Sequence, residues 1–206
     1  MHIYFVRHGE SVGNVHNVHQ NHTSPLTREG RRQAHIAAAR FAHIPIDGAF
    51  SSDFLRASET AKAIAHVIHP RIRYTPLLRE MHGPRELEGL HYGSKRAKEI
   101  RDALRVHRSE RDWHFSDEEN FYDLQARAIE FIDLLGKQKK KHILVVTHGL
   151  MLRMIVGTML FQELFSPDLF SAMFMTMRTR NTGITMVEHT RWGWKLNVWN
   201  DHAHLG

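Results

Sequence analysis

Two apolar segments rich in β-branched residues, each leading into His-Gly, constrain the fold of this chain more than any other feature. The first, Ile3–Val6, leads into Arg7-His8-Gly9, and the second, Ile143–Thr147, leads into His148-Gly149. Runs of this length and composition are typical of buried strands. The pattern therefore predicts two strand ends that each present a histidine, with a fixed cation beside the first.

Strand and helix patterns alternate along the sequence, which favours an α/β fold. We expect a three-layer α/β/α sandwich with a mostly parallel central sheet. Strands are expected near residues 2–7, 48–51, 73–75, 143–147, 173–177, 183–188 and 195–199, and helices after Thr27, over 54–67, to about 111, over 118–135 and over 150–159. In the segment 173–177, three methionines alternate with a period of two, which favours a strand over a cofactor or metal site.

Chain length and the absence of cysteine limit the possible classes of protein. The 206 residues can form one domain with its own core, and no linker divides them. We expect a single domain over residues 1–206, with residues 82–118 inserted as a cap. Without cysteine, thiolate catalysis, iron–sulfur ligation and sulfur-based zinc sites are excluded. No signal region or run of about 18 apolar residues occurs, which favours a cytoplasmic protein without a membrane partner.

The formal net charge of +6 favours anionic partners. The sequence has no recognised nucleic-acid-binding motif and no aromatic-interleaved basic groove, so we expect a phosphorylated small molecule and no nucleic acid. Most of the 18 histidines are expected to be bystanders. His16, His19 and His22 share a spacing of three, but their polar loop has no acidic partners. We therefore expect no metal site there.

The chemistry-bearing residues fall where an open α/β sheet binds its ligands, outside the carboxyl ends of the strands. His8, His148 and the segment 52–56 occupy such positions. Arg56 falls in the first turn of a helix, where backbone N–H groups and the helix dipole favour an anion. Its guanidinium adds forked donors that match phosphate oxygens. Together with Arg7, these residues predict a cationic cup around His8.

A cationic cup of this kind suits phosphoryl transfer, which depends on positioning and on neutralising the phosphoryl oxygens. Neutral imidazole is nucleophilic, so His8 could take the phosphoryl group and divide one difficult displacement into two easier ones. A carboxylic acid is then needed to protonate the leaving oxygen and later to deprotonate water. Glu80 is the best candidate, although spacing alone does not separate it from Glu86 or Glu88.

Four ordered blocks carry a resemblance to a known family. They are Arg7-His8-Gly9-Glu10-Ser11 with Asn14, Pro25-Leu26-Thr27 with Gly30 and Gln33, Ser52-Asp53 with Arg56, Ala57, Thr60 and Ala61, and Val146-Thr147-His148-Gly149 with Arg153. Together they resemble the histidine phosphatase superfamily, in the branch that contains cofactor-dependent phosphoglycerate mutases and related broad-specificity phosphatases. The resemblance spans nearly the whole chain and implies a phosphoglycerate mutase-like fold.

The resemblance also implies roles for individual residues. His8 would be the phosphorylated nucleophile and Glu80 the proton donor. The phosphate pocket would consist of Arg7, Arg56 and His148. Contacts to phosphoryl oxygens are implied for Asn14, Gln20 and the backbone of Gly149. No metal or organic cofactor is expected, except that a mutase would need 2,3-bisphosphoglycerate as a primer.

The sequence departs from the family pattern at two places. Met81–Gly89 is about one residue longer than the family pattern and lacks its aromatic residue, and Asn21 stands where a glycine is usual. We expect a phosphomonoester hydrolase. The alternatives are a cofactor-dependent phosphoglycerate mutase, which uses the same catalytic residues, and a non-catalytic phospholigand-binding protein. The physiological substrate and the oligomeric state, a homodimer included, stay open.

Overall fold

Six strands form one central sheet in the computed structural model, which describes residues 1–206. They are β1 (His2–Arg7), β2 (Gly48–Ser51), β3 (Ile72–Tyr74), β4 (His142–Thr147), β5 (Ile184–Thr190) and β6 (Gly193–Asp201). Their order across the sheet is β3-β2-β4-β1-β5-β6. The first four are parallel, whereas β5 is antiparallel to β1, and β6 is antiparallel to β5. The expected mostly parallel sheet is therefore confirmed.

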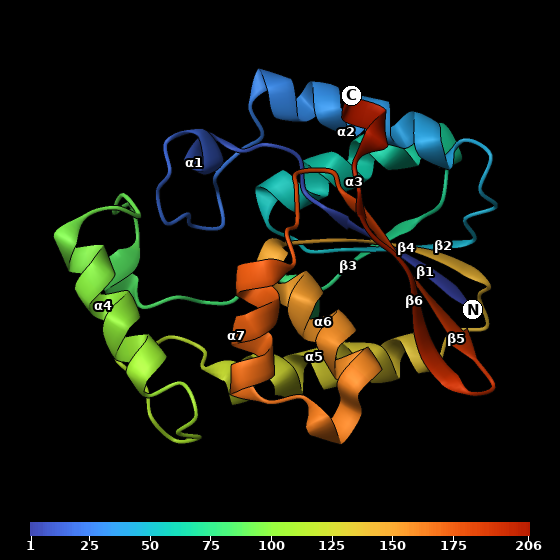
Figure 1. The fold of residues 1–206 in the computed structure, drawn as a ribbon. Coiled ribbons are helices and arrows are strands. Elements are labelled where there is room, and N and C mark those ends of the chain that lie inside the picture. The colour runs from blue at the N-terminus through green and yellow to red at the C-terminus, as the bar shows by residue number, and fades with distance from the viewer.

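Helices cover both faces of this sheet (Figure 1). They are α1 (Val12–Val15), α2 (Arg28–Phe41), α3 (Leu55–Ile68), α4 (Lys95–Val106), α5 (Phe121–Gly136), α6 (Gly149–Phe161) and α7 (Pro167–Thr176). No helix combines the length and apolar character needed to cross a membrane. Helices α2 and α3 pack on one face and α5 and α6 on the other, with α7 against α6. This arrangement confirms the three-layer α/β/α sandwich.

The alternation of side chains along β1 divides the core between the two faces. Ile3 and Phe5 belong to the cluster formed with α5 and α6, whereas Tyr4 and Val6 belong to the cluster formed with α2 and α3. A parallel strand covered on both faces needs apolar residues at nearly every position. This requirement explains the continuous apolar runs that the sequence shows in β1 and β4.

The loop that leaves β1 is held against the first turn of α2 by two glycines. A Cβ atom on Gly30 would lie 1.9 Å from the Glu10 carbonyl oxygen, and one on Gly9 would lie 2.5 Å from the Gly30 carbonyl oxygen. Both contacts therefore require a residue without a side chain. Thr27 caps α2, as expected, by accepting a hydrogen bond from the Gly30 N–H at 2.9 Å. This packing fixes the direction in which His8 leaves the sheet.

The strand expected at 173–177 is wrong, because this segment belongs mainly to α7. The helix begins after Ser166, whose side chain caps the first turn, and Pro167 occupies its first position. Both are helix-start signals, and they outweigh the period-two spacing of the methionines. Met173 is buried, whereas Met175 is 77% exposed, so the three methionines do not form one core face.

Residues 82–118 contain α4, which lies apart from the sheet (Figure 1). The segment has its own small apolar cluster, formed by Leu87, Ala97 and Ile100. Three backbone hydrogen bonds join it to the loop after β1. The His19 N–H donates to the Leu90 carbonyl oxygen and the Gly89 N–H donates to the His19 carbonyl oxygen, both at 3.0 Å, and the Tyr92 N–H donates to the Asn17 carbonyl oxygen at 2.8 Å. The segment is therefore attached to the loop that follows the first His-Gly.

Candidate active site

Three strand ends converge at one edge of the sheet. His8 follows β1, Ser52 follows β2 and His148 follows β4. The His8 N–H donates to the Thr147 carbonyl oxygen at 3.0 Å, and the two imidazole rings lie 5.1 Å apart between centroids. The sheet therefore brings the two histidines of the sequence motifs into one buried site.

The hydrogen bonds of His8 define its tautomer. Its Nδ1 lies 2.7 Å from the Gly9 carbonyl oxygen, which can only accept, so Nδ1 carries the proton. The Arg56 Nε, which can only donate, lies 3.3 Å from the His8 Nε2. Nε2 therefore carries the lone pair, directed toward the guanidinium.

The electrostatic surroundings keep His8 neutral. Burial and the nearby Arg56 and Arg7 guanidinium groups hold the pKa of His8 well below its usual value, although the hydrogen bond to Gly9 raises it. Burial lowers the pKa of Arg56 to about 10, so this side chain stays protonated at neutral pH. The site thus combines a neutral, nucleophilic imidazole with a fixed positive charge.

Arg7 lies in the same site with part of its guanidinium unpaired. Its Nη1 donates to the Thr179 carbonyl oxygen at 2.6 Å, while its buried Nε has no hydrogen-bond partner. A Cβ atom built on Gly149 would lie 3.7 Å from this Nε. Gly149 is the first residue of α6, where a backbone N–H has no acceptor within the helix. A buried donor from Arg7 and the positive end of α6 therefore lie side by side.

His148 is oriented by a residue that sequence reasoning left without a role. Its Nε2 lies 2.9 Å from the Ser52 Oγ, and its buried Nδ1 has no partner. Burial holds the pKa of His148 well below its usual value, and the neighbouring charges of Arg56, His8 and Arg7 lower it further. The sequence could have indicated that Ser52 lies at the site, because Ser52 directly follows β2. It gave no indication that His148 is the hydrogen-bond partner of Ser52.

The two buried histidines predict a loss of stability in mild acid. Their folded pKa values lie below the unfolded value of about 6.5, so the unfolded state binds more protons below that pH. The contribution of the two neutral histidines to the free energy of unfolding is fully present above pH 6.5. It is lost as the pH drops toward the folded pKa values, by up to about 1.4 kcal/mol per pH unit for each histidine. Urea unfolding of wild type and His148→Gln between pH 7 and 5 measures this slope. The slope of the unfolding free energy against pH should correspond to about one proton fewer taken up on unfolding in the variant than in wild type. Equal slopes would contradict a neutral His148.

The structure separates Glu80 from the two other candidate carboxylates. Glu80 Oε1 accepts hydrogen bonds from the Leu150 and Met151 N–H groups, both at 3.1 Å, at the first turn of α6 next to His148. Glu86 is exposed and instead accepts from the Ser116 hydroxyl at 2.7 Å, and Glu88 is exposed as well. Of the three, Glu80 therefore lies at the N-terminus of the helix that follows His148.

Asn14 lies closer to His8 than Gln20 does. Asn181 Nδ2 donates both to the His8 carbonyl oxygen at 3.0 Å and to Asn14 Oδ1 at 3.2 Å. Gln20 Oε1 accepts from the Ser11 hydroxyl at 2.7 Å, and that hydroxyl also lies 2.9 Å from Asn14 Oδ1. Asn14 is thus one side chain from His8, whereas Gln20 reaches the site only through Ser11.

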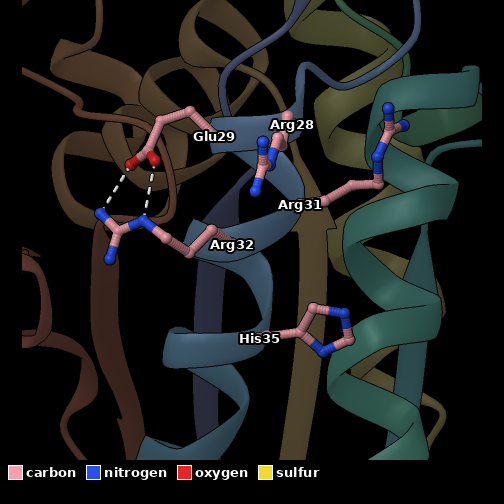
Figure 2. Close-up of a pocket in the computed structure, with 5 residues that line it drawn as sticks. All are labelled: Arg28, Glu29, Arg31, Arg32 and His35. Atoms are coloured by element: carbon pink, nitrogen blue, oxygen red, sulfur yellow. Dashed lines mark hydrogen bonds and ion pairs between the residues drawn. The ribbon is translucent and has the colours of Figure 1, made fainter.

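A surface hollow lies outside this site. It has a volume of about 620 Å³ and is lined by Arg28, Glu29, Arg31, Arg32 and His35 (Figure 2). Arg32 is held by Glu29 through two hydrogen bonds of 2.7 Å. None of these residues belongs to the histidine site. The structure also has no group of three or more His, Asp or Glu side chains arranged to hold a metal ion.

Solved structures share the fold of this chain at low sequence identity. The α-ribazole phosphatase of Shigella flexneri has a TM-score of 0.79 and 23% identity, with 98% of this chain and 96% of that chain covered. A mycobacterial glucosyl-3-phosphoglycerate phosphatase has a TM-score of 0.81 and 21% identity, with 97% and 98% covered. At these identities the likeness shows the fold alone.

Sequence comparisons identify the family. The protein named probable phosphoglycerate mutase GpmB in Photorhabdus laumondii is 30% identical over 98% of this chain and 94% of its own length. The model of the family described as histidine phosphatase superfamily (branch 1) matches residues 3–202. Because this match covers nearly the whole chain, the protein belongs to branch 1 of the histidine phosphatase superfamily.

Proposed function

We propose that this protein is a phosphomonoester hydrolase that works through a phosphohistidine intermediate on His8. The observation that carries the proposal is the contact between the Arg56 Nε and the lone pair on His8 Nε2, at 3.3 Å. A neutral nucleophile with a guanidinium at its reactive atom is suited to an anionic electrophile such as a phosphoryl group. The substrate class that fits is a phosphorylated small molecule.

The phosphoryl group would lie among donors that are buried and in part unpaired. Arg7 Nε and His148 Nδ1 have no hydrogen-bond partner in the protein, and unpaired buried polar atoms are costly unless a ligand satisfies them. On binding, the Arg56 guanidinium would pass from His8 Nε2 to a phosphoryl oxygen. The N–H of Gly149 would contribute the positive end of α6. Asn14 would reach the same oxygens, whereas we assign Gln20 the role of holding Ser11 and Asn14.

Two displacements complete the reaction. In the first, His8 Nε2 forms a bond to phosphorus while the bond to the leaving oxygen breaks, and the protonated Glu80 carboxyl gives its proton to that oxygen. The N–H groups of Leu150 and Met151 then stabilise the resulting carboxylate. In the second, Glu80 takes a proton from water as the water oxygen attacks phosphorus and the bond to His8 breaks. The products are an alcohol, inorganic phosphate and the free enzyme.

The cations of the site would neutralise the phosphoryl oxygens without a metal ion or an organic cofactor. Arg7 and Arg56 supply fixed positive charge, which metal ions supply in two-metal phosphatases. We therefore propose a metal-independent reaction.

A second observation favours a phosphoglycerate mutase as the alternative. Next to the site, Arg101 Nη1 and His19 Nε2 are buried without partners, and the His19 ring packs edge-on against Tyr92 at 4.4 Å. Burial and the Arg101 charge lower the pKa of His19 to about 4. An additional anionic group on the substrate would satisfy Arg101. A phosphorylated acid has such a group, and the Photorhabdus relative carries the name of a mutase.

Product analysis separates the candidate functions. The protein is incubated in EDTA with 4-nitrophenyl phosphate, and separately with 3-phosphoglycerate and a catalytic amount of 2,3-bisphosphoglycerate. We expect 4-nitrophenol release and inorganic phosphate as the main phosphorus product in both cases. Fast isomerisation of 3-phosphoglycerate with little free phosphate would establish the mutase instead. Binding of phosphate esters without turnover would establish a non-catalytic binding protein, and activity lost in EDTA and restored by a metal would contradict metal independence.

A further inference from the structure

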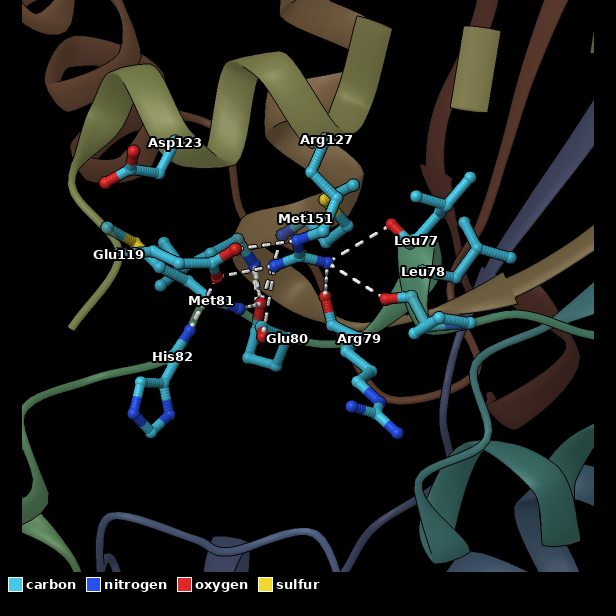
Figure 3. A network of polar contacts seen from close by, with 12 residues as sticks. Leu77, Leu78, Arg79, Glu80, Met81, His82, Glu119, Asp123, Arg127 and Met151 are labelled. Carbon is cyan, nitrogen blue, oxygen red and sulfur yellow. Dashed lines mark hydrogen bonds and ion pairs between the residues drawn. The ribbon is translucent and has the colours of Figure 1, made fainter. Parts of the chain in front are cut away.

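Arg127 on α5 holds the backbone of the segment that carries Glu80 (Figure 3). Its Nη1 donates to the carbonyl oxygens of Arg79 at 2.7 Å, Leu77 at 3.2 Å and Pro76 at 3.4 Å. Its Nη2 lies 3.4 Å from the Glu80 carbonyl oxygen. One guanidinium therefore reaches four carbonyl groups within five consecutive residues.

Glu119 completes the arrangement from the residues just before α5. Its carboxylate accepts from the Arg127 Nε at 2.7 Å and from Nη2 at 2.6 Å. It also accepts from the His82 N–H at 2.9 Å, while the Glu119 N–H donates to the His82 carbonyl oxygen at 2.9 Å. The Glu119–Arg127 pair thus contacts the chain on both sides of Glu80.

These contacts hold the short 3₁₀ helix Pro76–Leu78 and the irregular segment that follows it. Residues 80–84 have neither helix nor strand hydrogen bonds, so their backbone groups need other partners. Charge-assisted hydrogen bonds from a forked guanidinium are stronger than neutral ones, and both side chains of the pair are largely shielded, at 16% and 22% exposed. The segment is also the one in which the sequence departs from the family pattern. A loop without its usual aromatic residue is here fixed by an ion pair.

We propose that Arg127 and Glu119 are positioning residues, which hold Glu80 where it can exchange a proton with the substrate. The inference rests on the proposed function, in which Glu80 is the proton donor. It goes beyond that function because neither residue touches the substrate. Arg127 acts through the backbone of residues 76–80, and Glu119 acts through Arg127 and His82.

A comparison of leaving groups tests this role directly. Protonation matters for an alkoxide leaving group and little for 4-nitrophenolate, which leaves without help. In single-turnover experiments, Arg127→Ala should slow alcohol release from glycerol 2-phosphate by about 10- to 100-fold and 4-nitrophenol release by less than about threefold. Arg127→Lys, which keeps the charge but loses the fork, should be intermediate. Glu119→Gln should show the same selective loss at a smaller size.

Glu80→Gln and a matched arginine variant make the outcomes distinguishable. In a Glu80→Gln background, Arg127→Ala should add little further loss on glycerol 2-phosphate, because residues acting as a unit are not additive. Arg32→Ala removes another arginine held by two hydrogen bonds to a glutamate, far from this loop, and should leave both rates unchanged. Equal losses on the two substrates, or additive losses with Glu80→Gln, would overturn the positioning role. A Glu80→Gln protein with no selective loss would overturn the donor role itself and this inference with it.

Discussion

Replacing His8 with alanine is expected to abolish phosphate release, with a loss of about 10⁴-fold or more, as is common when a catalytic nucleophile is removed. The Nε2 of the neighbouring His148 is hydrogen-bonded to the Ser52 hydroxyl, so it does not present a free lone pair in place of that of His8. The measurement combines steady-state phosphate release with a denaturing quench. In wild type the quench should trap an acid-labile phosphohistidine, and in His8→Ala this species should be absent.

An exposed histidine provides the control for His8. His16 lies in the loop after β1 and is solvent-exposed, so His16→Ala should retain both turnover and the trapped phosphohistidine. Hydrolysis in His8→Ala within threefold of wild type would contradict the mechanism. A phosphoryl group mapped to a residue other than His8 would contradict it as well.

Arg56→Ala is expected to lower kcat/KM by about 10² to 10³, which corresponds to about 2.7–4 kcal/mol of transition-state stabilisation. The guanidinium is buried, already oriented by the Asn21 carbonyl oxygen at 2.8 Å, and placed at the reactive nitrogen of His8. Charge that is fixed before the reaction costs no reorganisation when the phosphoryl oxygens gain negative charge. Kinetics with 4-nitrophenyl phosphate would measure the loss.

A second consequence of Arg56→Ala concerns the nucleophile itself. The Arg56 charge lowers the pKa of His8, so its removal should raise that pKa and shift the acidic limb of kcat/KM to higher pH. Arg56→Lys keeps a charge without the fork and should recover only part of the rate. Arg40→Ala, which removes an exposed ion pair with Asp201, is the matched control and should behave like wild type. A loss below threefold in Arg56→Ala would exclude Arg56 from the phosphate pocket.

Local patterns were sufficient for most of the fold. The apolar runs of β1 and β4 and the capping threonine of α2 appear where the sequence places them. The error at 173–177 has a local cause as well, since Ser166 and Pro167 begin a helix seven residues before the first of the three methionines. A period of two over only five residues is too short to distinguish a strand from a helix.

The location of the site also followed from the sequence, whereas its internal geometry did not. A parallel sheet gathers the carboxyl ends of its strands at one edge, so His8 and His148 could be placed together from two local motifs. The guanidinium that faces the His8 lone pair comes from Arg56, 48 residues away, and the choice of Glu80 depends on Leu150, 70 residues away. Such contacts form only when separate elements pack against each other. They cannot be predicted from the sequence of a loop whose apolar residues show no periodicity.

The sequence by itself determined an α/β fold through its alternating strand and helix patterns, and the two apolar runs that end in His-Gly placed two histidines at one edge of the sheet. Only the tertiary structure decided how these histidines are held. It placed a guanidinium at Nε2 of His8, left Arg7 and His148 with unpaired buried atoms, and held the Glu80 segment with Arg127. The physical reason is that hydrogen-bond direction and burial are properties of packed neighbours, whereas the sequence records only which groups are present.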